Sequence, residues 1–209
     1  MMDAIKQTIR RPIHWLAVWL NRLSGSKLTP NAVTYIGLCM HVPIALLIAR
    51  QHNLWAAGLL VIFGLFDTLD GELARLQKRE SPYGMLLDSA TDRIKEILLY
   101  TGLAYAIIAS TGRPYLAVWA VAACGCSLLT SYINAWGDAI TAKLNIPGHA
   151  SNKAFRGGLF PFEVRMAVIV LGLLSNRLAL AVIVIAIGAG YTALSRIVRV
   201  AAKLKQADA

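Results

Sequence analysis

Residues 54–79 read LWAAGLLVIFGLFDTLDGELARLQKR, an apolar run that changes abruptly into an acidic and basic one. The run that begins near Leu54 suits a bilayer, whose hydrocarbon core takes about 20 helical residues to cross. Similar runs begin near five other positions: Ala32, Gly84, Tyr115, Glu163 and Leu178. The sequence therefore predicts an all-α polytopic membrane protein with about six transmembrane helices.

The composition agrees with a membrane protein. Hydrophobic residues make up 57% of the 209 residues and charged residues only 15%, which is more apolar than an ordinary soluble domain. The formal charge of +10 must then lie in loops and flanks, where it can meet anionic lipid headgroups. Membrane lipids are therefore expected partners, and nucleic acid is not.

The first 27 residues differ from the runs that follow. Apolar residues recur at intervals of three or four, with basic residues between them: Ile5, Ile9, Ile13, Leu16, Leu20 and Leu23, with Lys6, Arg10, Arg11 and Arg22. This pattern is typical of an amphipathic helix in the membrane interface, and Pro12 is a candidate kink. We expect an interfacial helix over 2–27 and a six-helix bundle over 28–203, together one domain spanning 1–209.

Lys and Arg are distributed unevenly between the two sides of the predicted bundle. Only Arg50, Arg113 and Arg177 fall on one side, and the remaining Lys and Arg fall on the other. The side richer in these residues is usually the cytoplasmic one. We therefore expect a cell-membrane protein whose termini, and whose loops after the second and fourth spans, face the cytoplasm.

Acidic residues are concentrated in one segment. Seven of the eleven acids fall between residues 67 and 96: Asp67, Asp70, Glu72, Glu80, Asp88, Asp92 and Glu96. Asp67 and Asp70 are three apart and Asp88 and Asp92 four apart, so each pair shares a helix face. A turn at Ser81 makes the two helices antiparallel. The sequence therefore predicts that the four aspartates converge beside a cytoplasmic turn.

Four aspartates near membrane depth require compensation, because each costs roughly 2.5 to 3.5 kcal/mol on insertion scales. A divalent cation compensates directly, and carboxylates without His or Cys favour magnesium, manganese or calcium over zinc. We expect Mg²⁺, with Mn²⁺ as a possible substitute. The alternative is ion pairing with nearby cations: Arg75, Lys78, Arg79, Arg93 and Lys95. Ion pairing alone, however, does not require Gly71 or the spacing of the aspartates.

The flanking residues suit a nucleotide diphosphate. Gly71 allows a substrate to approach the backbone closely, and Arg75, one turn further on, can bind a phosphate oxygen with its guanidinium. Thr29 and Ser81 each precede a proline, which predicts a capping hydroxyl and a helix start at both places.

Together, the stretch 67–75 with Gly84, Asp88 and Asp92 matches the pattern DxxDGxxARx8GxxxDxxxD. On this motif the chain resembles the CDP-alcohol phosphatidyltransferase family. The resemblance implies a homodimeric enzyme that uses a donor such as CDP-diacylglycerol and releases CMP. It implies donor binding by a set of nine residues: Thr29, Pro30, Asn31, Ala32, Asp67, Asp70, Gly71, Arg75 and Ser81.

The resemblance also implies roles for the aspartates. Asp67, Asp70 and Asp88 would be metal ligands on the diphosphate, and Asp92 would contribute to a second metal site. Asp92 would also be the catalytic base that takes the proton from the acceptor hydroxyl.

The acceptor is less well defined. The stretch 131–138 resembles the phosphatidylinositol phosphate synthase branch, but Asn134, Trp136 and Phe162 stand where that branch has basic residues. The remaining candidates for acceptor binding are Ser131, Asn134, Lys153, Arg156, Arg165 and Arg196. Their cations favour a phosphorylated acceptor, either inositol phosphate or glycerol 3-phosphate. A non-phosphorylated acceptor remains open, because positive-inside topology also explains these cations.

Two other functions fit the acidic residues less well. An ion or proton transporter would have acids on several helices near the bilayer midplane, whereas here they gather at one turn. Intramembrane prenyltransferases also use aspartates with magnesium on a diphosphate. They are longer chains with more helices and differently spaced acidic motifs, so the helix count here argues against them.

Overall fold

The computed structural model describes residues 2–143 and 159–207. Within these ranges every regular element is an α-helix, as the sequence predicts. The chain forms two compact units, Met1–Gly102 and Leu103–Ala209, and the helix α5 (Pro82–Thr111) passes from one into the other. Besides the first part of α5, the first unit contains α1 (Met2–Leu23), α2 (Pro30–Ala49), α3 (Asn53–Gly64) and α4 (Phe66–Gln77).

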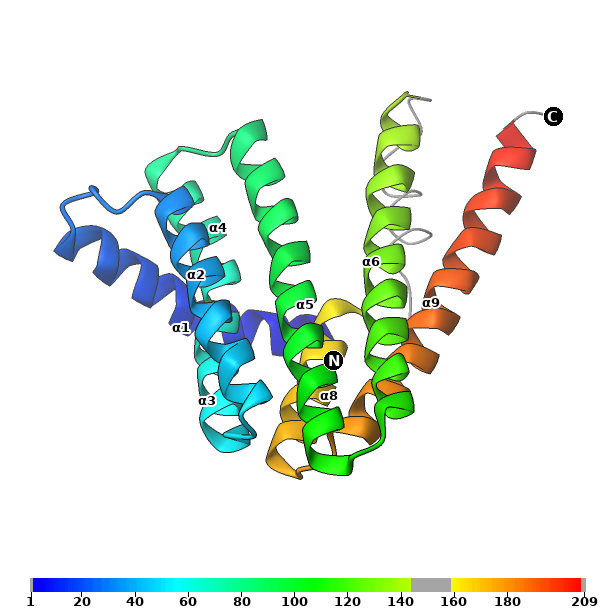
Figure 1. Ribbon diagram of the computed structural model, residues 1–209. Helices are drawn as coiled ribbons and strands as arrows, with labels where there is room; N and C mark the ends of the chain where they lie inside the picture. Colours follow the sequence, from blue (N-terminus) through cyan, green and yellow to red (C-terminus); the bar gives the residue numbers. More distant parts are fainter. Residues whose placement is uncertain (1, 144–158, 208–209) are drawn as a thin grey trace. The chain divides into compact units, whose positions relative to one another are not determined.

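The helix α1 runs crosswise to α2 and α4 in the first unit (Figure 1, blue). Its inner face buries Ile13 and Ala17 in a cluster with residues of α2 and α4: Val33, Leu69 and Leu73. Its outer face leaves Trp15 and Trp19 exposed, and the helix is continuous through Pro12. This division into a buried and an exposed apolar face agrees with a helix that packs on the protein and contacts the membrane interface.

The second predicted span is made of two helices. The helix α3 ends at Gly64 and α4 begins at Phe66. Between them, Leu65 N donates to the carbonyl of Ile62 at 3.2 Å, a tighter spacing than the four-residue step of an α-helix. The break places Asp67 in the first turn of α4, where the helix dipole favours a negative charge.

The helices α2 and α5 approach closely at Gly102. A Cβ added there would lie 2.6 Å from the carbonyl oxygen of Ala45. Small residues at such a crossing let helix backbones come together in membrane proteins. This packing fixes α5 against α2 and thereby sets the position of the acidic residues on α5.

The second unit contains the end of α5 with α6 (Pro114–Lys143), α8 (Phe162–Leu174) and α9 (Leu178–Ala207). The helices α6 and α9 pack on each other, and Thr130 Oγ1 lies 3.3 Å from the carbonyl oxygen of Ala189. Gly188 lies against the ring of Phe160, since an added Cβ would come within 2.5 Å of that ring. Figure 1 shows α8 and α9 joined by a short turn.

Five helical stretches in the described ranges are long and apolar enough to cross a membrane: Pro30–Ala49, Asn53–Gln77, Pro82–Thr111, Pro114–Gly137 and Leu178–Ala202. The run predicted near Glu163 forms α8, which has 13 residues and is shorter than the usual span of about 20. It ends at a tight turn in which Asn176 has a φ of 55°. The chain is therefore an integral membrane protein.

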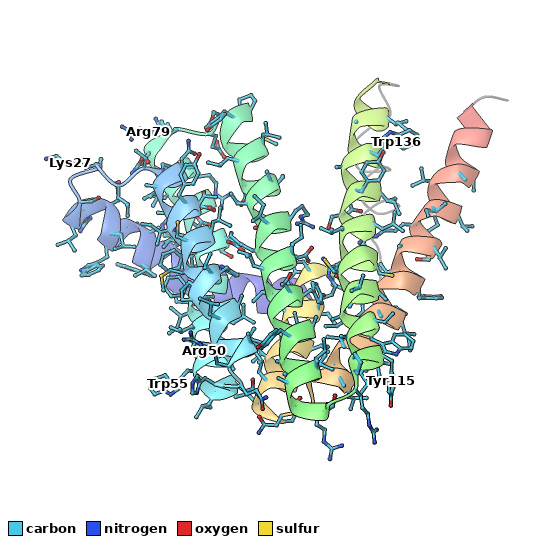
Figure 2. The ribbon with its side chains drawn as sticks, in the orientation of Figure 1. Lys27, Arg50, Trp55, Arg79, Tyr115 and Trp136 are labelled. Atoms are coloured by element: carbon cyan, nitrogen blue, oxygen red, sulfur yellow. The ribbon has the colours of Figure 1, made fainter. Side chains whose placement is uncertain are left out.

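The cations of the first unit are separated along its length. Figure 2 shows Lys27 and Arg79 toward one end of this unit and Arg50 with Trp55 toward the other. The Lys and Arg pattern predicts this separation, because it assigns Arg50 to the opposite side of the membrane from Lys27 and Arg79.

Candidate active site

Lys95 joins the two helices that carry the aspartates. Its Nζ lies 2.5 Å from Asp67 Oδ1 on α4 and 3.2 Å from Asp92 Oδ1 on α5. Asp92 and Lys95 are three residues apart, which places them on the same face of α5. The Lys95 side chain is only 3% exposed, so the ammonium group depends on these two carboxylates for its partners.

The other two aspartates complete the cluster. Asp70 Oδ2 accepts a hydrogen bond of 2.6 Å from Thr34 Oγ1 on α2. Asp88 is repelled by the charges of Asp92, Asp70 and Asp67, which shows that the four carboxylates lie within electrostatic reach of one another. Asp88 Oδ1 is buried and has no hydrogen-bond partner. The structure thus brings together the four aspartates that share two helix faces in the sequence.

The donor set fits a hard divalent cation. All four side chains supply carboxylate oxygens, and the buried Asp88 Oδ1 is an acceptor without a donor, which is unusual in a folded protein. As placed, no three His, Cys, Asp or Glu residues in the described part of the chain are arranged to hold a metal ion. In this arrangement Lys95 Nζ contacts both Asp67 and Asp92.

The starts of α2 and α5 lie side by side. Ala32 N donates to Thr29 Oγ1 at 3.2 Å, and Gly84 N donates to Ser81 Oγ at 3.0 Å, so both predicted caps are confirmed. A Cβ added to Gly84 would lie 3.3 Å from Ser81 Oγ and 3.5 Å from Asn31 Oδ1. Two segments that are far apart in the sequence therefore form one polar surface, next to Pro30 at the first turn of α2.

Arg75 lies beside Gly71, as the one-turn spacing predicts. A Cβ added to Gly71 would lie 3.9 Å from Arg75 Nη2. The guanidinium is held by Glu72 at 2.7 Å, and Glu72 also faces His14 of α1 at 3.5 Å. The Arg75 side chain remains 48% exposed, which leaves donors free to bind an anion.

Three arginines gather in the second unit. Arg165 and Arg196 are buried, with exposures of 1% and 2%. Arg196 Nη1 donates to the carbonyl of Thr130 at 3.0 Å, and Arg165 Nη1 donates to that of Phe160 at 3.2 Å. The charges of Arg165 and Arg199 both act on Arg196. Such a concentration of positive charge suits an anionic ligand.

The other predicted acceptor residues are placed differently. Ser131 Oγ donates to the carbonyl of Ser127 at 3.1 Å, whereas Asn134 Oδ1 is buried and has no hydrogen-bond partner. Lys153 and Arg156 lie outside the described residues.

Sequence reasoning did not place three residues in these sites: Thr34, Lys95 and Arg199. A helical-spacing signal existed for two of them, because Lys95 follows Asp92 by three residues and Arg199 follows Arg196 by three. Lys95 entered only as an ion-pair partner, and that alternative is realised in part, since Arg93 also lies 3.6 Å from Asp92 Oδ2.

Comparisons with known proteins find relatives whose sequences are similar to this chain. The phosphatidylinositol phosphate synthase of Corynebacterium glutamicum is 30% identical over 200 residues, which is 92% of this chain and 84% of that protein. The archaetidylinositol phosphate synthase of Pyrococcus horikoshii is 29% identical over 50% of this chain and 54% of that protein.

Two solved structures are also similar to this chain. The crystal structure of Mycobacterium tuberculosis phosphatidylinositol phosphate synthase with CDP-DAG bound matches with a TM-score of 0.76 and 26% identity, over 91% of this chain and 94% of that one. The structure of that enzyme in complex with manganese and citrate has a TM-score of 0.75 and 26% identity, over 90% of this chain and 88% of that one.

The family model for CDP-alcohol phosphatidyltransferases matches residues 27–194, from the loop between α1 and α2 into α9. This match includes all four aspartates and Arg165, and it ends two residues before Arg196. The chain therefore belongs to the CDP-alcohol phosphatidyltransferase family and is a membrane enzyme that transfers a phosphatidyl-type group from a CDP-alcohol.

Proposed function

We propose that this enzyme transfers a phosphatidyl group from CDP-diacylglycerol to a hydroxyl of a phosphorylated polyol and releases CMP. The observation that carries the proposal is the cluster of four aspartates on α4 and α5, in which Asp88 Oδ1 is buried without a partner. The carboxylates suit a cation on a diphosphate, and the arginines of the second unit suit a second anionic substrate.

The donor would bind to the first unit. The adjoining starts of α2 and α5 would hold the nucleotide through Thr29, Pro30, Asn31, Ala32 and Ser81, next to Asp67, Asp70, Gly71 and Arg75. Gly71 leaves the backbone open, and the exposed Arg75 guanidinium beside it can take a phosphate oxygen. Support comes from the tuberculosis enzyme, whose structure contains CDP-DAG.

The four aspartates, Asp67, Asp70, Asp88 and Asp92, would hold Mg²⁺ or Mn²⁺. A bound cation would neutralise charge on the diphosphate and on the leaving CMP. The complex of the tuberculosis enzyme with manganese supports a divalent ion of this kind. In this chain Lys95 contacts both Asp67 and Asp92, and Thr34 donates a hydrogen bond to Asp70. These two neighbours orient three of the four carboxylates.

Asp92 would act as the base. It would accept the proton of the acceptor hydroxyl while the oxygen of that hydroxyl forms a bond to the phosphorus on the lipid side of the diphosphate. The bond from this phosphorus to the CMP oxygen would break, and CMP would leave. A carboxylate is suited to this step when it lies within hydrogen-bond reach of the hydroxyl.

Arg165 and Arg196 would bind the phosphate of the acceptor, with Ser131, Asn134, Lys153 and Arg156 as further candidates. The charges of Arg165 and Arg199 repel Arg196, and a bound phosphate would relieve that repulsion. Inositol phosphate is the first candidate, because the relatives in Corynebacterium glutamicum and Pyrococcus horikoshii are inositol phosphate lipid synthases. Glycerol 3-phosphate is the second.

The enzyme would act at the cell membrane with its active site and both termini in the cytoplasm. The position of Lys27 and Arg79 at the end of the first unit opposite Arg50 supports this orientation (Figure 2). We also propose that residues 1–209 form one catalytic domain and that the enzyme is a homodimer.

The test uses purified protein in liposomes that contain CDP-diacylglycerol labelled in its CMP moiety. We expect Mg²⁺-dependent CMP release with inositol phosphate, and a product lipid whose mass contains the phosphorylated headgroup. Release only with inositol or serine would indicate a non-phosphorylated acceptor. No release with any acceptor would contradict the proposed transfer.

A further inference from the structure

The cationic group of Lys95 occupies the centre of the aspartate cluster. Its Nζ contacts one carboxylate from each helix, Asp67 Oδ1 at 2.5 Å and Asp92 Oδ1 at 3.2 Å. These are two of the four side chains assigned above to the divalent cation. A single pair of carboxylates therefore serves two different positive charges.

We propose that Lys95 is a built-in counter-cation, which holds Asp67 and Asp92 together before the divalent cation binds and releases them when it binds. This inference rests on the proposed metal-binding role of the aspartates. Lys95 would thus be a positioning residue that keeps α4 and α5 in register in the metal-free enzyme.

The two cations would compete for the same carboxylates. Magnesium requires oxygen ligands at about 2.0–2.1 Å in an octahedral arrangement, whereas an ammonium group offers only donors and no lone pair. A dication beside the ammonium would also be repelled by it. We therefore expect binding of the metal between Asp67 and Asp92 to displace Lys95 Nζ from these carboxylates.

The surroundings of Lys95 are consistent with this role. A Cβ added to Gly37 of α2 would lie 3.8 Å from Lys95 Nζ and 3.9 Å from its Cε, so this glycine leaves room beside the amine. The Lys95 side chain is 3% exposed, whereas that of Arg93, which faces Asp92 Oδ2 at 3.6 Å, is 30% exposed. Arg93 can remain in contact with solvent when a metal binds, whereas the buried Lys95 contacts a carboxylate on each of the two helices.

The direct test is Mn²⁺ binding, measured by electron paramagnetic resonance on purified protein without substrate. We expect Lys95→Met to bind Mn²⁺ about tenfold more tightly than the wild type, because the competing charge is gone. The variant should also melt at a lower temperature than the wild type in EDTA, and Mn²⁺ should restore more of its stability. The matched control is Lys27→Met, which removes an exposed lysine of the same unit and should behave as the wild type.

Equal or weaker Mn²⁺ binding by Lys95→Met would overturn this inference while leaving the proposed metal site intact. No Mn²⁺ binding by the wild type would overturn both. If Lys95→Met does not fold, acetylation by acetic anhydride gives a measurement on the wild type. Mn²⁺ should accelerate modification of Lys95 severalfold and leave Lys27 unchanged, and an unchanged Lys95 rate would overturn the displacement.

Discussion

Thr34 on α2 donates a hydrogen bond of 2.6 Å to Asp70 on α4. Both residues are buried, so this bond fixes one carboxylate of the cluster to a third helix. Removing only the donor would leave a buried carboxylate oxygen without a partner, which is more costly than removing both groups.

We therefore expect Thr34→Val to destabilise the enzyme by about 1.5–3 kcal/mol, the range for hydrogen bonds to charged groups. The melting temperature in detergent, measured in EDTA, should fall by several degrees. Thr34→Ser keeps the hydroxyl and is the matched control. Equal melting temperatures for the valine and serine variants would show that the bond contributes nothing to stability.

Asp92→Asn should abolish the proposed transfer while preserving the fold. The amide keeps the shape of the side chain but cannot accept the acceptor proton, and loss of a general base costs roughly 10²- to 10⁴-fold in rate. CMP release measures activity, and size-exclusion chromatography checks the fold. Glu80→Gln, which changes an exposed acid of the same segment, should keep wild-type activity. CMP release by Asp92→Asn at the wild-type rate would exclude Asp92 as the base.

The parts of the site that follow from local sequence were predictable. Asp67 with Asp70, and Asp88 with Asp92, share helix faces because their spacing matches the helical repeat. Thr29 and Ser81 cap helices because a hydroxyl before a proline favours a helix start. Each of these features depends on residues within one turn of each other.

The remaining parts depend on how the helices pack. The Thr34 to Asp70 bond and the Lys95 to Asp67 ion pair each join two helices, and hydropathy does not specify which faces meet. The break at Leu65 was also hidden, because the apolar run continues through it without a proline. The short length of α8 is visible in the sequence, because only 13 residues separate Pro161 from Ser175, where the turn before α9 begins.

Arg75→Lys should weaken donor binding more than it slows turnover. Lysine keeps the positive charge but loses the planar fork that matches phosphate. We expect the KM for CDP-diacylglycerol to rise about tenfold, equivalent to about 1.4 kcal/mol, with a smaller change in kcat. Arg79→Lys makes the same substitution at an exposed arginine just beyond α4 and should leave KM unchanged. Equal KM values for CDP-diacylglycerol in Arg75→Lys and Arg79→Lys would show that Arg75 does not bind the donor.

Gly102→Ala should destabilise the first unit. The new Cβ would lie 2.6 Å from the carbonyl oxygen of Ala45, and such overpacking typically costs about 1–3 kcal/mol. Gly58→Ala is a matched control, because it lies in a helix and its Cβ would have nothing within 4 Å. The melting temperature should fall for Gly102→Ala and stay the same or rise for Gly58→Ala. Equal melting temperatures would mean that α2 and α5 can separate at this crossing without cost.

Arg196→Gln should weaken binding of the acceptor and spare the donor. The glutamine can still donate to the carbonyl of Thr130, which Arg196 Nη1 contacts at 3.0 Å, but it brings no positive charge to a phosphate. A charged hydrogen bond contributes about 1.5–3 kcal/mol, so the KM for inositol phosphate should rise by at least about tenfold. The KM for CDP-diacylglycerol should not change, and Arg177→Gln, at an exposed arginine of the same unit, should change neither value. If Arg196→Gln raises the KM for the donor but not for the acceptor, the buried arginines do not bind the acceptor phosphate.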